Sequence, residues 1–145
     1  MIINNEMSLN FPSKSCNEAF ARSVVAAFVI SLDPTINELS DLKTAVSEAV
    51  TNCIVHGYRR QSGTIYIKGK IKNGNIVVIN IRDRGCGIED VQKAMEPLFT
   101  TAPEEERAGL GFAVMQSFCD KVKVKSEPGK GTTVTLEKKI GENER

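Results

Sequence analysis

The sequence predicts an α+β domain, a two-layer α/β sandwich with helices on one face of a mixed, mostly antiparallel sheet. Two observations support this fold class. The first is the order of the patterns: strand, helix, helix, two strands, a long polar stretch, helix, two strands. The second is that strands follow one another in pairs, so the strict strand–helix alternation of a doubly wound parallel sheet is missing. The 145 residues suit one domain with a single core.

The N-terminal elements are a short strand and a helix with a wide apolar face. Residues 7–11 alternate apolar and polar side chains, and Pro12 ends this strand. The stretch from Ser15 to Glu18 matches a capping box, and the helix that follows runs to about Leu32. Its apolar positions form two rows: Phe20, Val24 and Phe28, and Val25, Val29 and Leu32. So wide a face predicts either deep burial in the core or a contact with another subunit.

A second helix is expected after Asp33. Thr35 and Glu38 form another capping box, and Gly57 is expected to end the helix in the left-handed conformation. The expected core stripe of this helix comprises Ile36, Leu39, Leu42, Val46, Val50 and Cys53.

The C-terminal half contains four strands and one helix. The strands 64–71 and 76–81 are joined through Asn73-Gly74, which is the strongest short hairpin signal. The later elements are a polar loop over 89–108, a helix over 109–119, a strand over 121–125 with one face in water, a strand over 132–136 and a polar tail from Gly141.

Composition and charge exclude several classes of function. The 41% apolar and 26% charged fractions are ordinary for a globular protein. With a net charge of +1 and no basic block, the chain gives no reason to expect a nucleic-acid partner. The four cysteines form no C-x-x-C pair, which favours reduced thiols over a zinc site. No signal peptide and no membrane-length apolar run is evident, so we expect a cytoplasmic protein without a membrane partner.

Glu48 and Asn52 are the first candidate functional pair. They stand four residues apart in the second predicted helix, so they project to the same side. A carboxylate beside an amide suggests a proton acceptor next to an oxygen ligand for Mg²⁺. The alternative is that both side chains are solvated surface.

Two glycine motifs follow. In Asp83-x-Gly85-x-Gly87 the carboxylate could accept a hydrogen bond from the exocyclic amine of adenine, although a tight turn after a strand has the same pattern. Gly109-x-Gly111 before a helix is typical of an anion site, and Arg107 precedes it. The alternatives are a glycine helix start without a ligand and an ordinary loop charge. Neither a Walker loop nor a complete dinucleotide fingerprint is present.

The order of these boxes, with a final Gly131-Thr-Thr133, resembles the Bergerat (GHKL) ATP-binding superfamily, which includes gyrase, Hsp90, MutL and histidine kinases. The resemblance covers nearly the whole chain. It implies that ATP or ADP binds with Mg²⁺, that Asn52 is the metal ligand, that Glu48 is the catalytic base and that a lid closes over the nucleotide. The implied ATP-binding residues are Asn52, Asp83, Gly85, Gly87, Thr100, Thr101, Arg107, Gly109, Leu110, Gly111, Phe112 and Thr132.

Further stretches are similar to the small anti-sigma serine kinases of spore-forming bacteria. They are residues 17–23, 32–35, 46–52, 97–101 and 109–112. This resemblance implies a homodimer that inhibits a sigma F-like sigma factor and phosphorylates a serine on an anti-anti-sigma partner, the antagonist. Cys86 and Ala102 depart slightly from the family pattern.

Two alternative functions remain open from the motifs. One is an anti-sigma kinase for a stress-response sigma factor, and the other is a nucleotide-gated binding module without kinase chemistry. Arg22 borders the apolar face of the first helix, which suggests either a partner contact or a plain solvated charge.

Overall fold

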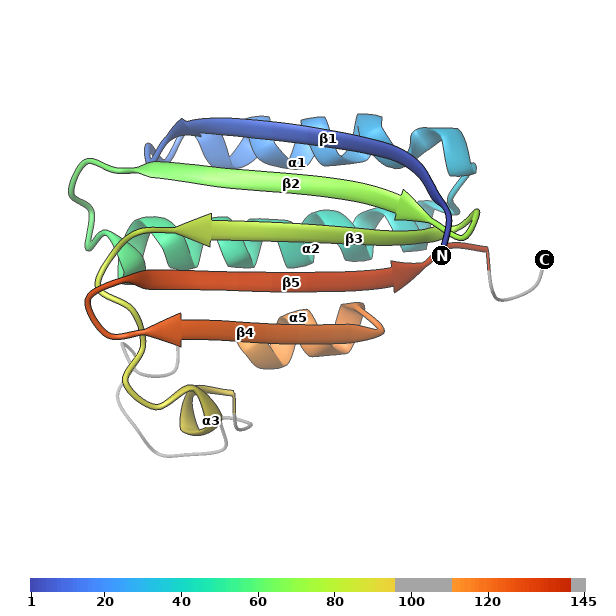
Figure 1. Cartoon of the computed structure of the whole chain (residues 1–145). Coiled ribbons are helices and arrows are strands. Elements are labelled where there is room, and N and C mark those ends of the chain that lie inside the picture. Colours follow the sequence, from blue (N-terminus) through green and yellow to red (C-terminus); the bar gives the residue numbers. More distant parts are fainter. Residues whose placement is uncertain (96–110, 142–145) are drawn as a thin grey trace.

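A computed structural model of the chain describes residues 1–95 and 111–141, and it shows a sheet with helices on one face (Figure 1). The five strands lie in the order β1-β2-β3-β5-β4. All four described pairings are antiparallel, so the α+β sandwich is confirmed and the expected mixture with parallel pairings is not found among them.

The described elements are β1 (Ile3–Pro12), α1 (Asn17–Val29), the 3₁₀ turn η1 (Ile30–Leu32), α2 (Ile36–Asn52), the π-helical turn η2 (Cys53–Gly57), β2 (Thr64–Lys72), β3 (Ile76–Asp83), α3 (Val91–Ala94), α5 (Phe112–Phe118), β4 (Lys121–Glu127) and β5 (Gly131–Lys139). None of the described helices combines the length and the apolar character needed to cross a bilayer.

The two predicted capping boxes have different outcomes. At α2 the box is confirmed: the Glu38 amide donates to Thr35 Oγ1 at 3.0 Å, and the Thr35 amide donates to Glu38 Oε1 at 2.9 Å. At α1 the prediction is wrong, because Cys16 is the cap residue and makes no side-chain cap hydrogen bond. Cys16 already has helical backbone angles, and Ser15 contributes only its carbonyl oxygen, which accepts from the Glu18 amide at 3.2 Å.

The core lies between the sheet and the helices. Fully buried side chains come from both layers: Val25, Val29, Leu42, Val46 and Val50 from the helices, and Ile65, Ile67, Ile79, Ile81 and Leu136 from the strands. Most of the α1 face is therefore covered within the chain, although Phe20 is 46% exposed. Ile36 was wrongly placed in the core stripe. It is the first residue of α2 and is 86% exposed.

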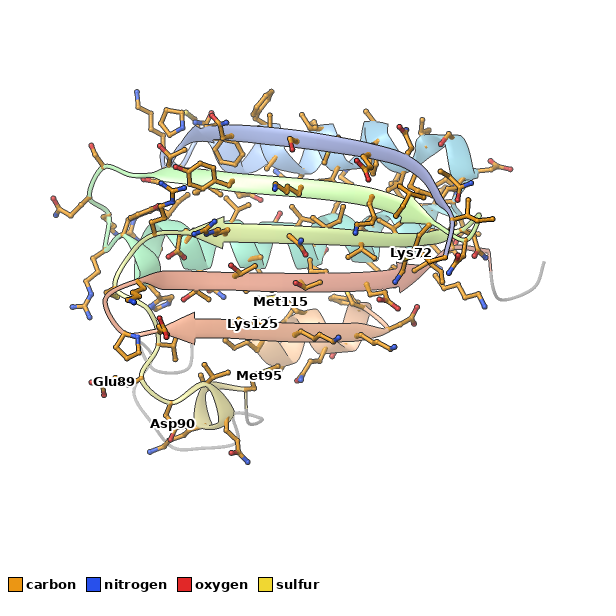
Figure 2. All side chains as sticks on the ribbon, in the orientation of Figure 1. Lys72, Glu89, Asp90, Met95, Met115 and Lys125 are labelled. Atoms are coloured by element: carbon orange, nitrogen blue, oxygen red, sulfur yellow. The ribbon has the colours of Figure 1, made fainter. Side chains whose placement is uncertain are left out.

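The other sheet face is open and carries charged side chains. Lys121, Lys123 and Lys125 of β4 are exposed, which confirms the predicted solvated face of that strand. Figure 2 shows Lys72 and Lys125 on this open face. Because β4 is the last strand in the sheet order, one of its edges has no neighbouring strand within the described residues.

Two glycine turns were predicted, one between β2 and β3 and one after α2, and they have different outcomes. Asn73 (φ 52°) and Gly74 (φ 88°) both lie in the left-handed region, which confirms the β2–β3 hairpin predicted from Asn-Gly. The left-handed stop predicted at Gly57 is wrong. Gly57 ends η2, and Arg59 and Arg60 have the positive φ angles instead. Gly57 is needed for space, since a Cβ there would lie 2.5 Å from Asp83 Oδ2.

The contrast between the two caps gives a stability prediction. We expect Thr35→Ala to lower the free energy of unfolding by about 1 kcal/mol, because the Glu38 amide loses its acceptor. Ser15→Ala is the matched control and should leave stability within about 0.5 kcal/mol of the original protein, as surface changes usually do. Urea unfolding followed by circular dichroism measures both, and equal losses would contradict the assignment of the caps.

Candidate functional site

The candidate site is organised around the carboxylate of Asp83, the last residue of β3. Asp83 is 3% exposed and pairs with Thr132 of β5 in the sheet. Its carboxylate accepts a hydrogen bond from the Gly85 amide at 2.9 Å, and the Thr132 amide and the Cys53 thiol lie near it. In Figure 1 the end of β3, the start of β5 and the end of α2 lie together at one end of the sandwich.

Burial and hydrogen bonding act in opposite directions on this carboxylate. Burial raises the pKa of Asp83 above its usual value, because the charged form loses its hydration. The donors from Gly85, Cys53 and Thr132 partly offset this increase by stabilising the charged form. The pKa of the Cys53 thiol is raised well above its usual value, by burial first and by the Asp83 carboxylate second, so this thiol stays protonated at neutral pH.

A small cavity lies against Asp83. It is lined by Ala49, Asn52, Cys53, His56, Gly57, Ile81, Asp83, Ile88, Phe112, Thr132 and Val134. A buried acceptor surrounded by apolar walls suits a flat ring that carries an amine. The free volume of about 20 Å³ holds one water molecule at most. A purine can therefore enter only if side chains of the lining, such as Ile88 and Phe112, move apart.

The glycine turn after β3 is held between two other segments. The Cys86 amide donates to Gly57 O at 2.9 Å, and its thiol contacts His56 O at 3.1 Å. On the other side, the Gly129 amide donates to Cys86 O at 2.6 Å. A Cβ on Gly85 would collide with the Gly57 carbonyl oxygen, so this position has no room for a side chain.

Gly87 has the second close approach in this turn. It lies in the left-handed region (φ 77°), and a Cβ there would collide with the carbonyl oxygen of Glu127. Both glycines of the Asp83 motif thus pack directly against protein backbone. Their contact with a nucleotide remains a prediction.

Asn52 and Glu48 occupy different parts of the site. Asn52 is 8% exposed and lines the cavity, so it is not solvated surface. Glu48 lies one turn earlier and is half-buried, and it lines a separate groove of about 370 Å³ between α1 and α2. Its Oε1 atom lies against Gly111, where a Cβ would collide with it. Burial raises the pKa of Glu48, and the negative charge of Glu18 raises it further.

Arg22 lines the same groove as Glu48. Its Nε atom lies 2.9 Å from Glu18 Oε2, which makes a close ion pair. The contact does not have the geometry of a hydrogen bond, and this buried nitrogen has no hydrogen-bond partner among the described residues. The Arg22 side chain is 38% exposed, so its charge can still reach a molecule placed in the groove.

The remaining predicted ATP-binding residues divide into two sets. Phe112 is 2% exposed and lines the cavity, and Thr132 pairs with Asp83 in the sheet and lines the same cavity. Gly111 (φ 60°) is the cap of α5, which begins at Phe112 and not at residue 109 as predicted. The other set lies outside the described residues: Thr100, Thr101, Arg107, Gly109 and Leu110.

Only the first part of the expected 89–108 lid can be described. Residues 91–94 form the short helix α3 where an irregular loop was predicted, and Asp90 caps it by accepting from the Lys93 amide at 3.0 Å. Figure 2 shows Glu89, Asp90 and Met95 around this helix, beyond the β4 edge of the sheet. The rest of the expected lid, residues 96–108, lies outside the described part of the chain.

Sequence reasoning missed two residues of the site. Cys53 is part of the expected core stripe, but it also lines the cavity together with Asp83. Ser126 joins the glycine turn to β5: its Oγ accepts from the Ile88 amide at 2.7 Å and lies 2.8 Å from Thr132 Oγ1. Neither residue belongs to a recognisable motif, and the periodicity of α2 and β4 gives no sign of these contacts.

Comparison with known proteins identifies the family. The model described as "Histidine kinase-like ATPase domain" matches residues 11–138. The protein named anti-sigma F factor from a Thermoanaerobacter species is 63% identical over 137 residues, which cover 94% of this chain and 95% of that protein. The anti-sigma F factor of Caldanaerobacter subterraneus is 60% identical over 143 residues, 99% of each chain.

Solved structures support the fold. The crystal structure of the RsbU and RsbW domains of a Mycobacterium tuberculosis protein matches with a TM-score of 0.69 at 17% identity, over 94% of this chain and 33% of that one. The histidine kinase domain of a blue-light activated histidine kinase from Erythrobacter litoralis matches with a TM-score of 0.57 at 16% identity, over 88% of this chain and 66% of that one. The chain therefore belongs to the histidine kinase-like ATPase domain family and, within it, to the anti-sigma F factors.

Proposed function

We propose that the protein binds and inhibits a sigma F-like sigma factor and uses Mg-ATP to phosphorylate a serine on an anti-anti-sigma partner. The observation that carries the kinase part is the position of Glu48. Its carboxylate lies against Gly111, one helical turn from Asn52 and the Asp83 cavity, and it also faces an open groove. A base so placed can face a nucleotide on one side and a protein acceptor on the other.

The nucleotide would be held mainly by Asp83 and Asn52. Asp83 accepts a hydrogen bond from the exocyclic amine of adenine, while Ile81, Val134 and Phe112 cover the ring. The amide oxygen of Asn52 would hold Mg²⁺, an ion that favours oxygen ligands. When bound, Mg²⁺ would neutralise charge on the transferring phosphate. Thr100, Thr101, Arg107, Gly109 and Leu110 complete the proposed ATP-binding set.

Glu48 would assist the transfer as a general base. The acceptor serine enters through the groove between α1 and α2, which also contains Arg22 and is open to solvent. Glu48 takes the proton of the serine hydroxyl while the serine oxygen bonds to the γ-phosphorus and ADP leaves. The pKa of Glu48 is shifted upward, in the direction of neutral pH, and a general base is most effective when its pKa is near the working pH.

The proposal includes protein partners in the cytoplasm. Arg22 is proposed as a contact for the sigma factor, because it is a partly exposed cation beside the catalytic groove. A homodimer is proposed as well, supported by large apolar side chains that stay exposed on the helical layer. These are Phe20, Ile30 and Ile36.

The role of Glu48 can be tested directly. We expect Glu48→Ala to keep ATP binding and to lower phosphorylation of the antagonist by about 10²-fold or more, the usual scale of general-base assistance. Calorimetry measures ATP binding, and the intact mass of the antagonist after incubation with Mg-ATP measures the added phosphate. Glu6→Ala removes an exposed carboxylate from β1 and is the control.

Near-normal transfer by Glu48→Ala would remove Glu48 from the catalytic role. If the original protein binds ATP and the sigma factor but adds no phosphate to the antagonist, the chain acts as a nucleotide-gated binding module.

The interaction between Glu18 and Glu48 predicts a pH effect. Glu48 must be deprotonated to act as a base, so phosphorylation falls when the pH drops through its pKa. The charge of Glu18 raises this pKa, and Glu18→Gln therefore lowers it and moves the acid limb of the pH–rate profile to lower pH. Initial rates measured at a series of pH values locate that limb, and Glu6→Gln should leave it in place. An unmoved limb in Glu18→Gln would show that another group sets it.

The proposed role of Arg22 predicts a selective loss of partner binding. We expect Arg22→Glu to weaken capture of the sigma factor about tenfold or more, the scale of a charged hot-spot residue, with no change in ATP affinity. Lys123→Glu makes the same charge change on exposed β4 and should have little effect. Biolayer interferometry with the immobilised sigma factor measures both variants. Equal losses in the two would mean that only overall charge matters.

A further inference from the structure

Ser126 and Thr132 face one another across the last hairpin, next to the cavity. They are cross-strand partners in the pairing of β4 with β5. Alternate residues of a strand point to the same face, so Thr132 shares its face with Val134, which is 3% exposed. Thr132 and Val134 both line the cavity together with Asp83. The partner of the Thr132 hydroxyl therefore affects what this wall of the cavity can offer a ligand.

Three close contacts use the full hydrogen-bonding capacity of the Ser126 hydroxyl. It accepts from the Ile88 amide at 2.7 Å and donates to the Gly131 carbonyl oxygen at 3.0 Å. Its oxygen also lies 2.8 Å from Thr132 Oγ1. A serine hydroxyl has one proton to donate and two lone pairs that accept, so these three contacts leave no position open.

Only one arrangement of protons satisfies all three contacts. A carbonyl oxygen cannot donate, so the Ser126 proton must point at the Gly131 oxygen for that contact to be a hydrogen bond. The contact between Ser126 and Thr132 then requires the proton of the threonine. If Ser126 donated to Thr132 instead, the oxygens of Ser126 and Gly131 would face each other without a proton between them. The Thr132 hydroxyl is thus held with its proton toward β4, and it offers only lone pairs to a ligand.

The polar groups that Asp83 and Thr132 bring to the cavity are then both acceptors. The exocyclic amine of adenine is a donor and matches them. A 6-oxo purine such as hypoxanthine has an N–H group that could pair with Asp83, but its carbonyl oxygen needs a donor as well. A threonine hydroxyl that was free to turn could supply that donor. Holding the Thr132 proton toward β4 removes this possibility, and an unpaired polar group is what a site discriminates against most strongly.

We propose that Ser126 is a positioning residue that contributes to the base specificity of the nucleotide site. It acts through Thr132, whose proton it keeps away from the cavity, so that a 6-amino purine is accepted and a 6-oxo purine is rejected. This inference rests on the proposed function and deepens it, because it assigns part of the base preference to a side chain outside the nucleotide-binding motifs. The competing explanation is that Ser126 only ties Ile88 and the glycine turn to β5.

The test compares two nucleotides on variants of the full chain. One is Mg-ATP, and the other is the Mg²⁺ complex of inosine triphosphate (ITP), whose base has a carbonyl oxygen in place of the amine. We expect Ser126→Ala to free the Thr132 hydroxyl and to strengthen ITP binding relative to ATP binding by about fivefold, the scale of one neutral hydrogen bond. Competition against a fluorescent ATP analogue measures both dissociation constants, and their ratio is the readout. A loosened glycine turn would weaken both nucleotides alike and leave the ratio unchanged.

A second change isolates the threonine hydroxyl. Thr132→Val removes it at nearly the same shape, so adding Ser126→Ala to Thr132→Val should leave the ratio unchanged. Ser117→Ala is the matched control and should keep the original ratio. Ser117 also donates to a backbone carbonyl oxygen, that of Ala113 at 3.0 Å, but it lies on α5 outside the residues that line the cavity. Circular dichroism shows which variants fold. If Ser126→Ala does not fold, the near-isosteric Ser126→Cys replaces it, because a thiol is a much weaker hydrogen-bonding group.

The outcomes separate this inference from the proposed function. An unchanged ratio in Ser126→Ala would mean that Ser126 only supports the turn, and a shift that persists in the Thr132→Val background would mean that it does not act through Thr132. Equal binding of the two nucleotides by the original protein would also overturn the inference. In all three cases ATP binding by the original protein leaves the proposed function in place. If the original protein bound neither nucleotide, the proposed function would fall and the inference with it.

Discussion

The structure depends on satisfying one buried carboxylate. Asp83 is almost fully removed from water, which is costly unless hydrogen-bond donors replace the lost hydration. The groups that stabilise its charged form come from three segments: the start of η2, the turn after β3 and the start of β5. The need to bring these segments together explains why Gly57, Gly85 and Gly131 lack side chains where they pass one another. The same convergence creates the cavity in which we place the nucleotide.

Features governed by local chemistry could be predicted from the sequence. The capping box at α2 and the Asn73-Gly74 hairpin depend on side chains that contact their own neighbours, and both are confirmed. The predictions failed where a distant part of the fold decides the outcome. Gly57 looks like a helix stop, but it is required because Asp83 occupies the space where its side chain would be. Ser15 has the chemistry of a cap, but the backbone of Cys16 is already helical.

The candidate site was predictable to the extent that it lies in motifs. Asp83, Asn52 and Phe112 surround one cavity and Glu48 lies on the neighbouring groove, while their roles in ATP binding and catalysis stay predictions. Cys53 could not be predicted, because its position in the apolar stripe of α2 already explained a small, buried residue. Ser126 was missed for a related reason. Its partners, Ile88 and Thr132, become its neighbours only when the β3 turn meets the β4–β5 hairpin.

The lysines of β4 have a consequence beyond the site. β4 borders the sheet, and a bordering strand can pair with another molecule and start aggregation. Lys121, Lys123 and Lys125 place a positive charge at every second position of the first five residues of β4, so edge-to-edge pairing of two copies would bring like charges together. Charge repulsion between copies therefore opposes pairing at the β4 edge. The helical layer remains available for specific protein contacts.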